Sequence, residues 1–173
     1  MNPITVMIAG ESRQRAFCRK LLDREAGIAV AGDIRPGLKM LAAAARLRPR
    51  VLLLDFTRLR LDALVGLSAI RRHSPRTRVI LLTSLRTSDA LILEGLKRGA
   101  LGCLDKAALP GLLPKAIRAV SAGEAWVPRR MARHLRDGLL PLAGGERIGP
   151  APDASAPKGR RWARADGSRR HAS

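Results

Sequence analysis

The chain has 173 residues, of which 46% are hydrophobic and only 2% aromatic, so it can bury one domain-sized core made of Leu, Val, Ile and Ala. Its net charge of +19 favours a polyanionic partner such as nucleic acid, an acidic protein or an anionic membrane surface, although a solvated arginine-rich surface gives the same value. No apolar run reaches the roughly 20 residues of a membrane-spanning helix, and neither a signal peptide nor a disulfide or zinc framework is predicted. We therefore expect a cytoplasmic protein whose two cysteines, Cys18 and Cys103, are reduced thiols in the core.

Two kinds of apolar segment alternate along the first 122 residues. Short β-branched runs, apolar at consecutive positions, predict strands that are buried on both faces. They lie at Ile4–Ala9, Ile28–Ile34, Val51–Asp55, Val79–Leu82 and Gly102–Leu104. Segments with apolar residues at helical spacing follow each strand. The predicted helices are Ser12–Glu25, Gly37–Leu47, Leu61–His73, Ser88–Arg98 and Pro114–Ala122.

The alternation predicts an α/β fold with a doubly wound, five-stranded parallel sheet covered by helices on both faces. Right-handed crossovers leave few arrangements, of which the flavodoxin-like order 2-1-3-4-5 is the commonest at this size. The last helix is expected to begin late, because Pro114 would remove a hydrogen bond from a helix that began at Pro110.

The C-terminal part of the chain departs from this pattern. We predict that residues 1–127 form the α/β domain and that residues 128–141 form a linker with a short helix at Arg129–Arg136. Residues 142–173 contain Gly, Pro, Ala, Ser and Arg without an apolar period, which cannot offset the entropy of ordering. They are therefore predicted to be a disordered basic tail.

Polar residues follow the predicted strands where a doubly wound sheet binds ligands. For the order 2-1-3-4-5 the strand order reverses between strands one and three, which brings Glu11 and Asp55 to one edge. Thr83 ends the fourth strand, and Lys106 follows the fifth. Carboxylates hold a hard cation such as Mg²⁺, and a carboxylate beside it can attack phosphorus. A lysine and a hydroxyl can then stabilise the phosphoryl oxygens.

Five segments of the α/β repeat carry a resemblance to a known family. They are ITVMIAGES, RPRVLLLDF, TRVILLTS, LKRGALGCLDKA and IRAVSAGEAW. Over residues 4–127 the chain resembles bacterial response-regulator receiver domains, in particular those of the NarL/LuxR-type subgroup. The resemblance covers the whole repeat, and the order and spacing of the segments make it specific.

The resemblance implies a function and a set of site residues. It implies two-component signal transduction, in which a sensor histidine kinase transfers a phosphoryl group to Asp55. Thr83 would be the switch hydroxyl and Lys106 the lysine that such domains share, and Mg²⁺ would be held by Glu11, Asp55 and the backbone carbonyl of Thr57. Such a domain is a phosphoacceptor and not an enzyme with an independent substrate. We also expect a homodimer through the last strand and helices.

The pocket departs from the family pattern at several positions. Such receivers usually carry two acidic residues after the first strand, and here the first of them is Gly10. The usual Met-Pro after the phosphoacceptor is Arg58 and Leu59, and the positive charge of Arg58 and Arg60 opposes cation binding. Cys103 stands where an aromatic switch residue is usual. A degenerate, phosphorylation-independent receiver therefore remains an alternative.

No helix-turn-helix output domain is recognisable in the C-terminal segment, so a truncated LuxR-type transcriptional regulator is a further alternative. A small-ligand enzyme is disfavoured, because the first turn has no glycine-rich nucleotide motif. The basic tail is a candidate DNA contact, in which cationic side chains meet phosphates and Trp162 stacks on a base. Its residues are Lys158, Arg160, Arg161, Trp162, Arg164, Arg169 and Arg170.

Overall fold

The strands of the protein form one parallel sheet. The structure is a computed structural model, and it describes residues 2–57, 61–136 and 148–150. The strands are β1 (Ile4–Ala9), β2 (Ile28–Ile34), β3 (Val51–Asp55), β4 (Arg78–Thr83), β5 (Ala100–Asp105), β6 (Ala125–Val127) and β7 (Ile148–Pro150). They lie in the order β2-β1-β3-β4-β5-β6-β7, and every neighbouring pair is parallel. The predicted flavodoxin-like order of the first five strands is confirmed.

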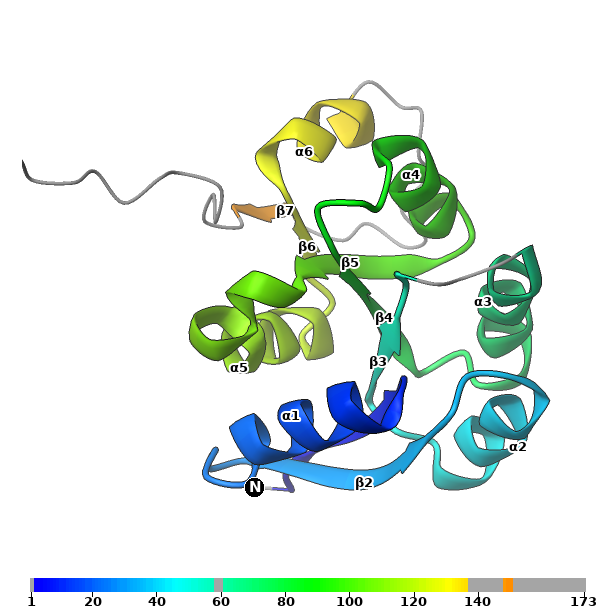
Figure 1. Cartoon of the computed structure of the whole chain (residues 1–173), viewed down its shortest axis with the longest axis vertical. Helices are drawn as coiled ribbons and strands as arrows, with labels where there is room; N and C mark the ends of the chain where they lie inside the picture. Colours follow the sequence, from blue (N-terminus) through cyan, green and yellow to red (C-terminus); the bar gives the residue numbers. More distant parts are fainter. Residues whose placement is uncertain (1, 58–60, 137–147, 151–173) are drawn as a thin grey trace, which may run out of the picture.

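Helices follow the strands in alternation. They are α1 (Ser12–Leu22), α2 (Leu38–Leu47), α3 (Leu61–His73), α4 (Asp89–Lys97), α5 (Leu109–Ser121) and α6 (Arg129–Arg136), with a short 3₁₀ helix, η1 (Lys106–Ala108), before α5. Helices α1 and α5 cover one face of the sheet, and α2, α3 and α4 cover the other (Figure 1). No helix in the described part of the chain is long and apolar enough to cross a membrane.

The sheet is buried on both faces because its central strands are apolar at consecutive positions. Along β3, for example, Leu52 and Leu54 belong to the cluster that packs under α2, α3 and α4, whereas Val51 and Leu53 belong to the cluster under α1 and α5. Alternate side chains of a strand point to opposite faces, so a continuous apolar run supplies both halves of the core.

Helix α5 differs from its prediction. It begins at Leu109 and carries Pro114 in its interior, rather than beginning at Pro114. Pro114 does cost one helical hydrogen bond. However, Leu109 and Leu113 are both fully buried in the core under α1 and α5, and this packing holds the first turn in place. Tertiary burial therefore outweighs the local signal.

The sheet is wider than predicted on the β5 side. Trp126 of β6 pairs with Gly102 of β5, and β7 pairs with β6 along three residues. Strand β7 lies within the segment predicted to be a disordered tail, and residues 151–173 of that segment lie outside the described residues. The predicted short helix at Arg129–Arg136 is confirmed as α6, which packs onto the α4 side of the sheet through Met131.

Candidate functional site

Asp55 lies where the strand order of the sheet reverses. It is the last residue of β3, which pairs with β1 on one side and β4 on the other. The chain continues in register for one more residue, because the amide of Phe56 donates to the carbonyl oxygen of Leu82 at 2.8 Å. Asp55 is 8% exposed, so its carboxylate reaches solvent only through the pocket at this edge. This is the position predicted from strand order.

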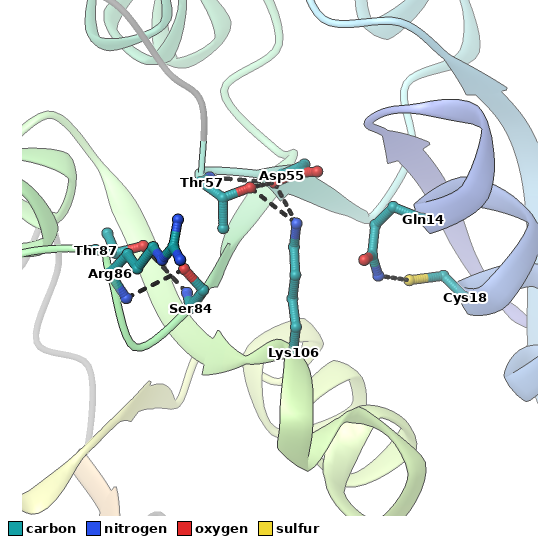
Figure 2. A network of polar contacts seen from close by, with 8 residues as sticks. All are labelled: Gln14, Cys18, Asp55, Thr57, Ser84, Arg86, Thr87 and Lys106. Atoms are coloured by element: carbon teal, nitrogen blue, oxygen red, sulfur yellow. Dashed lines mark hydrogen bonds and ion pairs between the residues drawn. The ribbon is translucent and has the colours of Figure 1, made fainter.

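Three donors converge on one oxygen of the Asp55 carboxylate. The Thr57 hydroxyl donates to Oδ1 at 2.6 Å, the Thr57 amide donates to it at 3.1 Å, and Lys106 Nζ lies 2.8 Å from the same atom. Lys106 Nζ also donates to Thr57 Oγ1 at 2.9 Å. Figure 2 shows the resulting triangle of Asp55, Thr57 and Lys106, in which the lysine side chain extends from the start of η1 toward the end of β3. Among described residues, the second oxygen, Oδ2, accepts no hydrogen bond.

Burial and hydrogen bonding act on Asp55 in opposite directions. Burial raises the pKa of the carboxyl, whereas the hydrogen bonds from Lys106 and Thr57 lower it; the net result is a pKa below the ordinary value. A buried carboxylate that keeps its charge is unusual unless donors and a cation compensate for lost hydration. Asp55 is therefore held as an anion, the form a nucleophile requires.

A pocket of about 550 Å³ opens over this carboxylate. Its lining residues are Glu11, Arg13, Gln14, Ala16, Phe17, Lys20, Asp55, Thr57 and Lys106. One wall is formed by α1, from Glu11 just before it to Lys20, and the other by the residues at and just after the ends of β3 and β5. Three cationic side chains around one recessed carboxylate suit a substrate with a negatively charged phosphoryl group.

Glu11 and Gly10 decide how well the pocket suits a divalent cation. Glu11 precedes the first residue of α1 and lines the same pocket as Asp55. A Cβ placed at Gly10 would lie 3.7 Å from Asp55 Oδ2, so Gly10 borders the oxygen that the hydrogen bonds leave open. Two carboxylates and a backbone carbonyl are hard oxygen ligands of the kind Mg²⁺ takes together with water. No group of three His, Cys, Asp or Glu suited to a metal exists among described residues, which leaves this as a site with few protein ligands.

Thr83 lies at the predicted edge of the sheet, and its expected role as the switch hydroxyl stays a prediction. It ends β4 beside Asp105 of β5 and is buried. In the described structure Asp55 accepts no hydrogen bond from it, and Thr83 is not among the residues that line the pocket. The loop that follows is fixed by its own side chains, since the Ser84 amide donates to Thr87 Oγ1 at 3.1 Å (Figure 2).

Sequence reasoning missed the Thr57 hydroxyl, which bridges the Asp55 carboxylate and the Lys106 ammonium. The family resemblance assigns Thr57 only a backbone carbonyl. The sequence signals only the backbone part of this turn, because an Asp side chain commonly accepts from the amide two residues on, as Asp55 does from Thr57. The contributions of Phe17 and Lys20 to the pocket depend on the way α1 packs, which no short motif encodes.

The remaining predicted positions divide into two groups. Cys18 and Cys103 are free and buried, as expected, and burial raises the pKa of the Cys103 thiol to about 12. The predicted charges at Arg58 and Arg60 and the tail residues from Lys158 to Arg170 lie outside the described residues.

Together, the reversed strand order and the Asp55–Thr57–Lys106 cluster define a flavodoxin-like α/β domain with a candidate phosphoacceptor carboxylate. Residues 6–118 match the sequence model of the response regulator receiver domain, and the chain belongs to this family. A receiver domain is a phosphoacceptor rather than a catalyst that turns over an independent substrate. The predicted resemblance is thus confirmed.

Individual relatives agree with the NarL/LuxR-type resemblance. The chain is 33% identical over 138 residues to the nitrate/nitrite response regulator protein NarP of Escherichia coli, covering 79% of this chain and 63% of NarP. It is 32% identical over 107 residues to the uncharacterized transcriptional regulatory protein YxjL of Bacillus subtilis, covering 62% of this chain and 49% of YxjL. The chain thus spans between about half and two thirds of these proteins.

A solved structure shows the same fold. The isolated REC domain of RcsB from Salmonella enterica serovar Typhimurium superimposes with a TM-score of 0.65 at 26% identity, covering 77% of this chain and 98% of that domain.

Proposed function

We propose that the protein is a response regulator that accepts a phosphoryl group on Asp55 from the phosphohistidine of a sensor kinase. The observation that carries this proposal is the Lys106 ammonium 2.8 Å from a buried Asp55 carboxylate, at the bottom of an open pocket with further cationic side chains. Family membership supports it, because receiver domains interact with sensor histidine kinases. Since the matched relatives include a named transcriptional regulator, we further propose that the output is transcriptional and that the protein acts in the cytoplasm.

The transfer step needs few groups. An oxygen of the Asp55 carboxylate attacks the phosphorus of the phosphohistidine, an O–P bond forms, and the N–P bond breaks with its electron pair left on the imidazole nitrogen. Oδ2 suits this attack, because Oδ1 already accepts from Thr57 and Lys106. The product is an acyl phosphate. The Lys106 ammonium group can then move from the carboxylate to the phosphoryl oxygens and stabilise them by charge-assisted hydrogen bonds.

Receiver domains generally use Mg²⁺ at this site, and its chemistry would be to neutralise the phosphoryl oxygens. In this chain Glu11, Asp55 and the Thr57 carbonyl would hold it. Because Gly10 supplies no carboxylate, we expect weak binding of the cation and a requirement for high magnesium concentrations.

Intact-mass measurement tests the proposal. The full chain incubated with acetyl phosphate and Mg²⁺ should gain about 80 Da, one phosphoryl group. Asp55→Asn should abolish the gain, and Asp23→Asn, which removes an exposed carboxylate after α1, should retain it. If wild-type protein gains no mass and binds no beryllofluoride, the proposal fails and the phosphorylation-independent alternative stands.

A further inference from the structure

Three turns at the amino edge of the sheet, opposite Asp55, form an unusually cationic surface. They connect α2 to β3, α3 to β4 and α4 to β5. Their sequences are RLRPR (46–50), RRHSPRTR (71–78) and KRG (97–99), which hold nine Arg and Lys residues and no carboxylate. Because β3, β4 and β5 are neighbours in the sheet, the three turns lie side by side.

Specific contacts hold these turns together. The amide of Arg78 donates to the carbonyl oxygen of Arg50 at 3.0 Å, and Thr77 Oγ1 donates to the carbonyl oxygen of Pro49 at 2.7 Å. A Cβ at Gly99 would lie 3.2 Å from Arg71 Cδ, so the α4–β5 turn touches the end of α3. These contacts fix the positions of the three turns relative to one another.

Part of this charge is already engaged. Arg50 donates to the carbonyl oxygen of Ser121, and Arg98 pairs with Glu94 at 2.8 Å. Arg78 is half-buried and also has an interaction partner. Six others have no ion pair with any described carboxylate, and they make up what we call the arginine edge. Its residues are Arg46, Arg48, Arg71, Arg72, Arg76 and Lys97, and all six are exposed.

Helix electrostatics account for only part of the arginine edge. Cations are favourable in the last turn of a helix, which covers Arg46, Arg71, Arg72 and Lys97. Arg76 lies in a turn outside any helix. Arg48 adopts a left-handed backbone with φ of 45°, where glycine is the usual residue and a side chain costs about 1 kcal/mol. The charge of Arg48 is favoured by its place at the C-terminal cap of α2 although its backbone conformation favours glycine, whereas local structure gives no reason for arginine at position 76.

We propose that the arginine edge binds the phosphate backbone of nucleic acid. Five of its six cations are arginines, whose planar guanidinium matches phosphate with two parallel hydrogen bonds. An anionic membrane is the poorer fit, because surface binding to lipid also uses apolar anchors. In the described part of the chain the large exposed apolar side chains, Phe17, Leu38, Val65 and Leu85, lie outside these turns. The proposal does not depend on phosphorylation of Asp55.

Salt-dependent binding of the full chain to a DNA duplex of about 20 base pairs tests this surface. Each phosphate neutralised adds about −0.9 to the slope of log K against log salt concentration. The triple variant Arg46→Gln, Arg72→Gln, Arg76→Gln should therefore reduce the slope by about 2 to 3 and weaken binding at least tenfold at about 0.1 M salt. It should unfold at the same urea concentration as wild type, since these side chains are exposed.

Two control variants, each of which also removes three positive charges, test whether the loss of DNA affinity is specific to the arginine edge. Lys39→Gln, Arg86→Gln, Lys115→Gln removes three exposed cations from other parts of the described surface and should change binding by less than the edge triple. Arg160→Gln, Arg161→Gln, Arg164→Gln removes the same charge from the C-terminal segment. The proposal is overturned if the edge triple binds DNA as tightly as wild type, or if all three triples lose affinity equally. It is also overturned if the edge triple loses affinity only for phosphatidylserine vesicles.

Discussion

Lys106 offsets the cost of burying Asp55. Replacing Lys106 should therefore change both the titration of Asp55 and the pH dependence of stability. Lys106→Met removes one of the two side-chain donors to Asp55 Oδ1, so the pKa of Asp55 should rise. A carboxyl NMR titration of Asp55 measures it directly. Lys20→Met, a change in the same pocket without a bond to Asp55, should leave this pKa close to that of wild type. An unchanged Asp55 titration in the Lys106 variant would show that the ion pair does not hold the carboxylate.

The same change has a definite pH dependence in stability. The pKa of Asp55 is lowered in the folded protein, so its stabilising contribution is complete above the ordinary carboxyl pKa of about 3.9 and is lost as pH falls through the folded value. Lys106→Met should cost about 1–3 kcal/mol at neutral pH, and the difference should shrink in acid.

Gly10 sets the charge of the cation site. Gly10→Asp places a third carboxylate beside Asp55 Oδ2, and we expect Mg²⁺ to bind about tenfold more tightly, equivalent to about 1.4 kcal/mol. Isothermal titration calorimetry gives the affinity. Gly10→Ala is the matched control, because both variants bring a Cβ 3.1 Å from Asp55 Cβ, but only Asp adds charge. Equal affinity in the two variants would mean that the missing carboxylate does not limit binding.

At the scale of elements, Gly95 lets α4 approach the sheet closely. A Cβ at this position would lie 2.6 Å from Leu81 Cδ1 and 3.2 Å from Phe56 Cζ. Gly95→Ala gains up to about 1 kcal/mol of helix propensity but forces two buried side chains to move, which costs about 1–3 kcal/mol. The variant should therefore be less stable in urea unfolding.

Gly111 of α5 provides the comparison, because a Cβ there meets no atom within 4 Å. Gly111→Ala should stabilise the protein by up to about 1 kcal/mol. Opposite signs for the two glycine-to-alanine changes would confirm that close packing, and not helix propensity, governs α4. Because Phe56 follows Asp55 directly, the packed side chains also connect α4 to the site.

At the scale of the whole molecule, the two ends of the sheet carry different chemistry. Asp55, Thr57 and Lys106 lie at the carboxyl ends of the strands. The six cationic residues of the arginine edge lie at the amino ends. The predicted homodimer through the last strand and helices must also accommodate β6 and α6, since Trp126 pairs with β5 and Arg130 pairs with Asp89 of α4 at 3.0 Å.

The sequence predicts most of this architecture, and the failures have physical causes. A parallel sheet covered on both faces follows because consecutive apolar runs can be buried only between two helical layers. Right-handed crossovers then favour the strand order that places Asp55 and Lys106 on one edge. The predicted start of α5 is wrong, because the burial of Leu109 and Leu113 outweighs the loss of the helical hydrogen bond at Pro114. The strand at Trp126 was not predicted, because three residues are too few to show a periodic pattern. The bridging role of Thr57 was not predicted either, because it depends on side-chain geometry within a single turn.

Trp126 also has an optical consequence. The chain has no tyrosine and two tryptophans, so Trp162→Phe leaves Trp126 as the sole indole. Trp126 is 9% exposed and lies in β6 beside β5, three strands along the sheet from Asp55 in β3. In this variant its emission then reports the outer margin of the sheet without an attached dye, in the folded protein and during every titration described above.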